Sequence, residues 1–275
     1  MALTLNLLPW MAGGLAILIG LVCDAILITR FVPSPAFHIQ RKSWGLHELA
    51  VATVVVSGLF ILSGVAYAAF TQLTDKNFET LAPLILPVEL VLRIATLFGF
   101  AIFFKRRHIA LASSLGLDSV TTRAALKWGA IFGLASLPPV GAVMLANDGF
   151  CRLIGIQPTE QPIADLFIAT DSRIVLVTLT LFALVVAPAF EEFFFRGFAY
   201  PALKERFGPV RALVFVSAAF AASHLHGPSF VPLFVLALGL GLAYELTGSL
   251  LTPVTMHAVF NGTMLVQLFY QRAHP

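Results

Sequence analysis

Long apolar segments separated by short polar stretches set the hydropathy pattern of this chain. A transmembrane α-helix needs about 20 consecutive apolar residues, and most of these segments approach that length. The pattern therefore predicts an all-α fold, a polytopic membrane bundle of about eight transmembrane helices. The expected helices span Trp10–Thr29, Leu49–Phe70, Leu84–Phe104, Trp128–Ala146, Ile174–Phe190, Ala212–Leu225, Phe230–Leu246 and Leu250–Phe269. The fifth is expected to continue past Phe190, through the glutamates that follow.

The composition favours a membrane protein and excludes an ordinary soluble domain. Hydrophobic residues make up 59% of the 275 residues and charged residues 11%, whereas soluble domains carry about 25% charged residues. The net charge of +3 comes with basic residues in short loops beside apolar segments, so it does not indicate nucleic-acid binding. We therefore expect the lipid bilayer as a partner and no nucleic acid.

Basic residues are unevenly distributed over the connections between the apolar segments. They follow the first, third and fifth segments, whereas the second and fourth are followed mainly by acidic residues. The positive-inside rule then predicts a multi-pass protein of the cell's inner (cytoplasmic) membrane with both termini outside. No internal repeat or linker divides the chain, so one membrane domain over residues 1–275 is expected. Residues 109–126 alternate leucines with polar residues, which indicates a surface helix, a helical extension or an ordinary amphipathic connector.

Two motifs in the first half of the chain have simple interpretations. Glu89 and Arg93 stand one helical turn apart inside the third segment, a spacing that favours a structural ion pair. His47–Glu48 begins like the zinc-protease motif H-E-x-x-H, but Val51 occupies the position of the second histidine. That zinc motif is therefore absent.

The C-terminal part of the chain places ionisable residues inside apolar segments. Each charge at the centre of a lipid-buried helix costs about 2.5–3.5 kcal/mol, so such residues are functional candidates. The group consists of Glu191, Glu192 and Arg196 in the fifth segment, Phe220 and His224 in the sixth, and His257 and Asn261 in the eighth.

Helix geometry indicates which of these residues meet. Arg196 follows Glu192 by four residues and can hold its carboxylate, whereas Glu191 points about 100° away and is free for a different task. If the turn at Phe207–Pro209 joins an antiparallel hairpin, Glu191 and His224 each lie about 25 Å from it and meet at one depth. This expectation assumes unbroken helices, which the prolines of this region could interrupt.

These residue types together support hydrolysis of an amide bond. A carboxylate whose surroundings bring its basicity close to neutral pH acts as a general base toward water. A histidine can share the proton or orient the water, and a histidine and an asparagine on one helix face are suitable donors for an oxyanion. No serine or cysteine stands out beside a base as a nucleophile.

Three spaced motifs, E-E-x-x-x-R, F-x-x-x-H and H-x-x-x-N, follow one another on separate apolar segments. With these motifs the chain resembles the CPBP family of intramembrane proteases, which includes type II CAAX prenyl endopeptidases and bacteriocin-processing and immunity-type relatives. The resemblance covers residues 174–269 as a catalytic core and leaves residues 1–173 as accessory N-terminal helices.

The resemblance implies a role for each matching residue. Glu191 would activate the water with help from His224, His257 and Asn261 would stabilise the transition state, and Glu192, Arg196 and Phe220 would support the site. It implies a mechanism without a metal, with a zinc ion held by glutamate and histidine as the alternative. The implied substrate is a hydrophobic or lipidated peptide or protein, cleaved near a membrane-associated end, of which a prenylated CAAX-type end is one form.

Two other functions are left open by the sequence. A non-catalytic membrane scaffold or immunity protein would bind its partner through the same polar residues, and Glu191→Ala would leave its phenotype unchanged. A transporter or proton relay would show repeated halves with broken helices at matching positions, and none is found.

Overall fold

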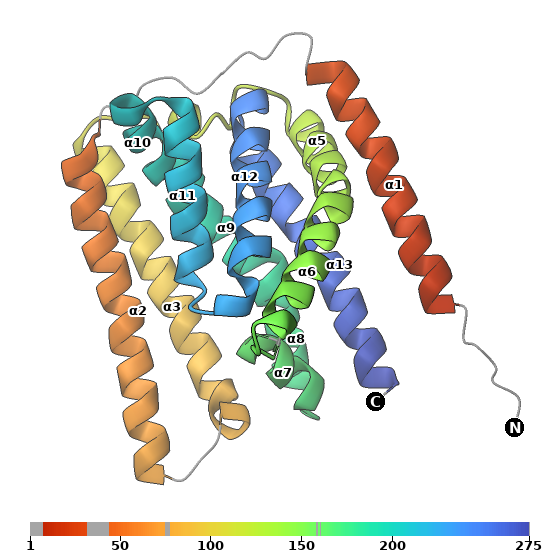
Figure 1. Ribbon diagram of the computed structural model, residues 1–275. Coiled ribbons are helices and arrows are strands. Elements are labelled where there is room, and N and C mark those ends of the chain that lie inside the picture. The colour runs from red at the N-terminus through yellow and green to blue at the C-terminus, as the bar shows by residue number, and fades with distance from the viewer. Residues whose placement is uncertain (1–7, 32–43, 75–77, 158, 160, 275) are drawn as a thin grey trace, which may run out of the picture.

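The computed structural model describes residues 8–31, 44–74, 78–157, 159 and 161–274, and its regular elements are helices throughout these ranges (Figure 1). The predicted all-α fold is therefore confirmed. The α-helices are α1 (Leu8–Phe31), α2 (Leu46–Thr74), α3 (Phe78–Arg106), α4 (Leu111–Ser114), α5 (Thr122–Ala135), α6 (Leu137–Leu153), α7 (Pro162–Ala169), α8 (Arg173–Leu181), α9 (Ala187–Glu192), α10 (Tyr200–Phe207), α11 (Pro209–Ser223), α12 (Phe230–Thr247) and α13 (Leu251–Ala273). Two π-helical turns, η1 (Phe182–Val186) and η2 (Phe193–Ala199), flank α9, and a 3₁₀ turn, η3 (Gly227–Ser229), precedes α12.

Six of the described helical segments are long and apolar enough to cross a membrane. They are α1, α2, α3, the pair α5–α6, the continuous run α8–α10, and η3 with α12. Of the other two expected spans, α11 is apolar but has only 15 residues, and α13 carries several polar side chains, among them His257 and Asn261. The chain is thus a multi-pass helical membrane protein in contact with lipid.

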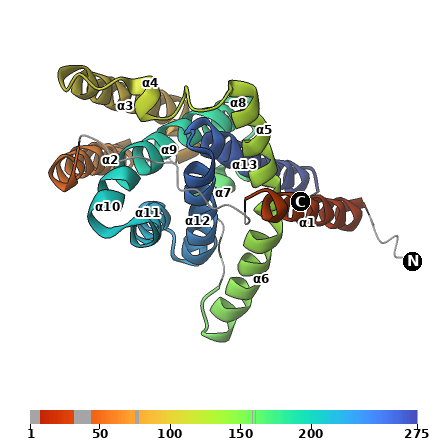
Figure 2. The same cartoon turned by 90° about the horizontal axis from the view of Figure 1, so that it is seen from above.

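The bundle is organised around α12 and α13, which lie near its centre with α1 and α2 at opposite edges (Figures 1 and 2). Small residues bring the central helices together. A Cβ on Gly129 of α5 would lie 2.5 Å from Thr255 Cβ of α13, and a Cβ on Gly133 would lie 2.8 Å from Val259 Cβ. The G-x-x-x-G spacing of α5 therefore fits directly against α13.

Two of the expected helices depart from a regular α-helix. The predicted span Trp128–Ala146 is divided at Ser136, where α5 ends and α6 begins with prolines at its start. The run α8–α10 stays helical, but η1 directly precedes α9, which has Pro188 at its second position, and η2 directly precedes α10, which has Pro201 there. Proline cannot donate the i→i−4 hydrogen bond, and a wider π turn accommodates the missing donor. The run is therefore continuous, and the two π turns change only its local pitch.

The connector over residues 109–126 forms only the one-turn helix α4 and the start of α5. It packs against the turn between α12 and α13: Leu250 N donates to Leu115 O at 3.0 Å, and Ser119 Oγ donates to Gly248 O at 3.1 Å. Gly116 has a positive φ of 65°, and a Cβ at this position would lie 1.7 Å from Gly248 O. These contacts of the connector hold the turn between α12 and α13 in place.

Gly116→Ala is expected to destabilise the protein through both backbone strain and steric overlap. Gly155→Ala is the matched control, because Gly155 also has a positive φ of 79° but no atom near its missing Cβ. Left-handed strain costs about 1–2 kcal/mol in either variant, and overlap with a backbone oxygen adds about 1–3 kcal/mol to Gly116→Ala alone. Thermal unfolding in detergent measures the difference, and equal losses would contradict the close packing at Gly116.

Candidate active site

A cavity of about 840 Å³ opens inside the helical bundle. Its walls come from α2, α3, α6, α7, the run η1–α9, η3, α12 and α13, and from His224 directly after α11. Four of the sequence-predicted site residues line it, namely Glu191, His224, His257 and Asn261. The other three, Glu192, Arg196 and Phe220, are fully buried behind this wall. The sequence prediction of their chemical roles stays a prediction.

Glu192 forms the buried centre of the site. Its Oε1 accepts from Arg196 Nη1 at 2.9 Å and from His257 Nδ1 at 3.0 Å. Arg196 uses its Nη2 to donate to Ala237 O of α12 at 2.8 Å, and its guanidinium lies 4.8 Å from the centroid of the Phe220 ring. These contacts join the run α9–η2 to α11, α12 and α13.

Glu191 lies on a different side of the same helix and faces the cavity. Its side chain is 22% exposed, whereas that of Glu192 is 0% exposed. The separation follows from the 100° turn between successive helical residues. Glu191 Oε2 lies 4.0 Å from His257 Nε2, so His257 stands between the two carboxylates with one ring nitrogen toward each.

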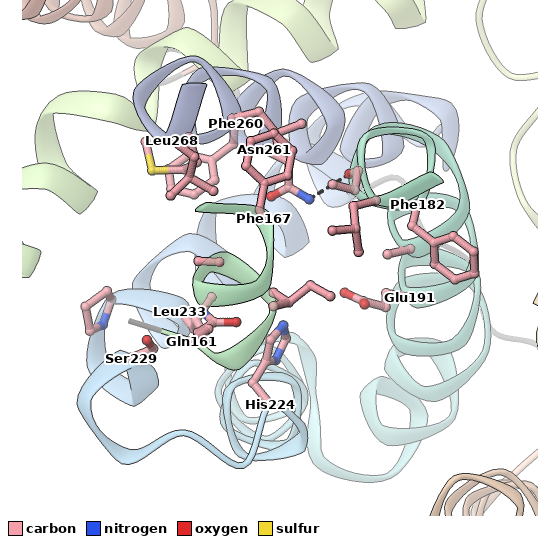
Figure 3. A pocket seen from close by; sticks show the side chains of 18 of the residues that line it. Gln161, Phe167, Phe182, Glu191, His224, Ser229, Leu233, Phe260, Asn261 and Leu268 are labelled. Carbon is pink, nitrogen blue, oxygen red and sulfur yellow. Dashed lines mark hydrogen bonds between the residues drawn. The ribbon is translucent and has the colours of Figure 1, made fainter. Parts of the chain in front are cut away.

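His224 points into the cavity from the end of α11. Figure 3 shows its imidazole and the Glu191 carboxylate directed toward the same space. His224 Nδ1 lies 2.8 Å from the carbonyl oxygen of Phe220, the residue one turn earlier. Because Nδ1 donates to this carbonyl, Nε2 of the neutral ring is available as an acceptor in the cavity.

The loop after His224 is fixed by polar contacts that the sequence did not reveal. Leu225 has a positive φ of 52°, an uncommon conformation for leucine. Asn147 Nδ2 of α6 donates to Pro228 O at 2.7 Å. His226 bridges Thr159 Oγ1 and Ser229 Oγ at 3.0 and 2.7 Å. Residues without helical periodicity give no sequence signal for such contacts.

Asn261 lies one turn beyond His257 on α13 and contacts η1. Its Nδ2 donates to Ala183 O at 2.9 Å (Figure 3). An amide nitrogen carries two hydrogens, so one N–H of Asn261 can still donate to a ligand in the cavity. His257 is 4% exposed and already faces both glutamates, so the two residues have different surroundings despite sharing a helix face.

The Glu89–Arg93 ion pair is present, with Nη1 and Oε2 2.6 Å apart, as the sequence predicted. Both residues also line the cavity, where Ser63 Oγ of α2 donates to Glu89 Oε1. This location could not be predicted from the sequence, because the rotation of α3 about its axis depends on its packing.

The described side chains of the site were compared with the donor sets that hold metal ions. Within the ranges that the structure describes, no group of three or more His, Cys, Asp or Glu residues is arranged to hold a metal ion. His257 directs its nitrogens toward two carboxylates, and His224 Nδ1 contacts a backbone carbonyl. A structural or catalytic zinc ion needs at least three protein ligands, and this donor set does not fit one.

Comparison with known proteins identifies one family. Residues 173–263 match the family model described as type II CAAX prenyl endopeptidase Rce1-like. The match covers about a third of the chain and includes all seven predicted site residues. In comparisons with curated proteins and with solved structures, no match was found.

Arg196→Met is expected to destabilise the fold because it leaves Glu192 buried without its guanidinium partner. Breaking a buried ion pair costs about 3–5 kcal/mol. Arg107→Met is the control, since Arg107 pairs with Glu48 while its side chain is 51% exposed, and exposed pairs contribute about 0–1 kcal/mol. Chemical denaturation in detergent compares the two variants. Similar losses for both would show that the buried pair does not hold the helices together.

Proposed function

We propose that the chain is an intramembrane endopeptidase of the CPBP family with Glu191 as its general base, and the Rce1-like match over residues 173–263 supports this proposal. The observation that carries this proposal is the unequal environment of the two glutamates. Glu192 is enclosed by Arg196 and His257, whereas Glu191 faces a cavity that His224 also enters.

In the proposed reaction, a water molecule between Glu191 and His224 attacks the scissile carbonyl carbon. Glu191 takes one proton from the water as the new C–O bond forms, and His224 Nε2 accepts the other water hydrogen as a hydrogen bond. Glu191 then returns the proton to the leaving nitrogen as the C–N bond breaks. Water and amide are thereby converted to an acid and an amine, with no external oxidant or co-reactant.

The developing oxyanion needs donors in the same cavity. The second N–H of Asn261 is one, and the Nε2–H of a protonated His257 is another. Glu192 accepts from the opposite nitrogen of this ring at 3.0 Å, which orients the imidazole. Glu192, Arg196 and Phe220 act through His257 and are positioning residues in this proposal. No step uses a metal.

The proposed substrate is a hydrophobic or lipidated peptide or protein that reaches the cavity from the bilayer. Apolar side chains supply much of the cavity wall, including Phe182, Leu233 and Phe260. The Rce1-like family acts on prenylated proteins, and we propose cleavage near such a membrane-associated end. The orientation predicted from the basic loops, with both termini outside the inner membrane, belongs to the same proposal.

Glu191→Gln is expected to lower cleavage of a quenched prenyl-peptide by about 10²–10⁴-fold, the contribution of a general base. Glu205→Gln is the matched control, because Glu205 is exposed on α10 and does not line the cavity. Thermal unfolding of both variants checks that the fold is kept. Full activity of Glu191→Gln would refute the proposed base. If Glu191→Gln left the function of the protein in the cell unchanged, the alternative of a non-catalytic scaffold would be favoured.

Cleavage by the purified protein is expected to persist after treatment with a strong chelator, because the proposed water activation depends on Glu191 alone. The rate is compared before chelation, after chelation and after addition of zinc. A loss of activity that zinc restores would contradict the metal-free mechanism and support the alternative of a zinc enzyme.

A further inference from the structure

A second polar group lies in the wall of the same cavity. It consists of Glu89 and Arg93 on α3, whose side chains are 18% and 17% exposed, and Ser63 on α2. Arg93 Nη1 contacts Glu89 Oε2 at 2.6 Å and Glu89 O at 3.3 Å. Ser63 Oγ donates to the other oxygen of the Glu89 carboxylate. Glu89 therefore has partners on both of its oxygens.

Arg93, in contrast, keeps unused donors. Both of its hydrogen bonds in the described part of the chain run through Nη1, and its Nε is buried without a hydrogen-bond partner. A guanidinium carries five N–H donors, and such groups are normally satisfied when buried. Nη2 makes no hydrogen bond within the described residues and is not among the enclosed atoms, so its N–H groups are the donors that suit an acceptor oxygen brought by a ligand.

Aromatic rings hold the guanidinium in place. The Arg93 Cζ atom lies 4.9 Å from the ring centroid of Phe60, 5.5 Å from that of Phe182 and 5.7 Å from that of Phe190. Phe190 immediately precedes Glu191, and Phe182 immediately precedes Ala183, whose carbonyl contacts Asn261. The cation is therefore fixed against the same helical run that presents the proposed base.

The charges around the cavity restrict where an anion can bind. Its described lining includes the carboxylates of Glu89, Asp148 and Glu191 and the guanidinium groups of Arg93 and Arg152. Arg152 is an exposed residue near the end of α6, whereas Arg93 is largely enclosed. A carboxylate that enters a region of low dielectric needs a paired cation. Of the two arginines in the described lining, Arg93 is the one enclosed enough to serve as that cation.

Building on the proposed function, we propose that Arg93 binds the free C-terminal carboxylate of the substrate. Arginine binds carboxylates through its planar fork of donors. A C-a-a-X end places its free carboxylate only a few residues beyond the modified cysteine, so this carboxylate and the scissile bond can occupy one cavity. Glu89, which Ser63 holds by a hydrogen bond, positions Arg93 and neutralises its charge when no substrate is bound. Arg93 thereby selects peptides that end shortly after the cleaved bond.

The test compares two prenylated peptides of identical sequence, one with a free C-terminal carboxylate and one with a C-terminal amide. Wild-type protein is expected to prefer the free acid by about 10- to 100-fold in kcat/KM, mainly through KM, as for one hydrogen bond to a charged group. Arg93→Gln is expected to lose this preference, so that its kcat/KM for the free acid is no higher than its kcat/KM for the amide. Arg93→Lys, which keeps the charge, is expected to retain part of it.

Arg152→Gln is the matched control, since Arg152 is the other arginine in the described cavity lining. It is expected to keep the full preference for the free acid. The double variant Glu89→Gln/Arg93→Gln covers the case in which Arg93→Gln fails to fold, because it leaves no unpaired carboxylate. Equal cleavage of both peptides by wild-type protein would overturn the inference. So would a preference that survives in Arg93→Gln or disappears in Arg152→Gln.

Binding of both peptides to the Glu191→Gln variant separates this inference from the proposed function. If wild-type protein cleaves neither peptide, but the free acid binds more tightly and needs Arg93, the protease proposal fails and the carboxylate site stands. If wild-type protein cleaves both peptides equally and they bind Glu191→Gln equally, the carboxylate site fails and the protease proposal stands.

Discussion

The burial of two opposite charges, Glu192 and Arg196, is the constraint on which the arrangement of this bundle depends. Both side chains are fully enclosed within a membrane protein. An isolated charge there would cost several kcal/mol, even after relaxation. The pair is tolerable because its partners come from three other helices: a carbonyl of α12, a ring of α11 and an imidazole of α13. One ion pair thus fixes four helical segments relative to one another.

The same constraint makes two neighbouring glutamates chemically different. Glu192 is committed to Arg196 and His257, and the helical turn of 100° per residue directs Glu191 elsewhere. His257 links the two, because its Nδ1 contacts Glu192 and its Nε2 lies 4.0 Å from Glu191. A group that stabilises the fold therefore also orients a ring next to the free carboxylate. His257 thus contributes both to the packing of the bundle and to the proposed chemistry.

Features that depend on a single helix could be predicted from the sequence. Segment lengths placed most of the membrane helices, and the i,i+4 spacing of Glu192 and Arg196 predicted their ion pair. Features that depend on local backbone chemistry were less accessible: η1 and η2 beside the prolines, and the His224–Phe220 carbonyl contact. The direction in which Arg93 faces could not be predicted, because three aromatic rings from other parts of the chain determine it.

The chemical groups and the walls of the cavity come from different parts of the chain. The family match over residues 173–263 contains all seven predicted site residues, whereas α2, α3, α6 and α7 precede it and supply a large share of the cavity lining. These earlier helices also bring Asn147 to the loop after His224 and Arg93 to the helix that carries Glu191. Substitutions in the first 172 residues can therefore change the shape of the cavity without altering these seven residues. The part of the chain that matches the family model supplies the polar groups, and the helices that precede it shape the space around them.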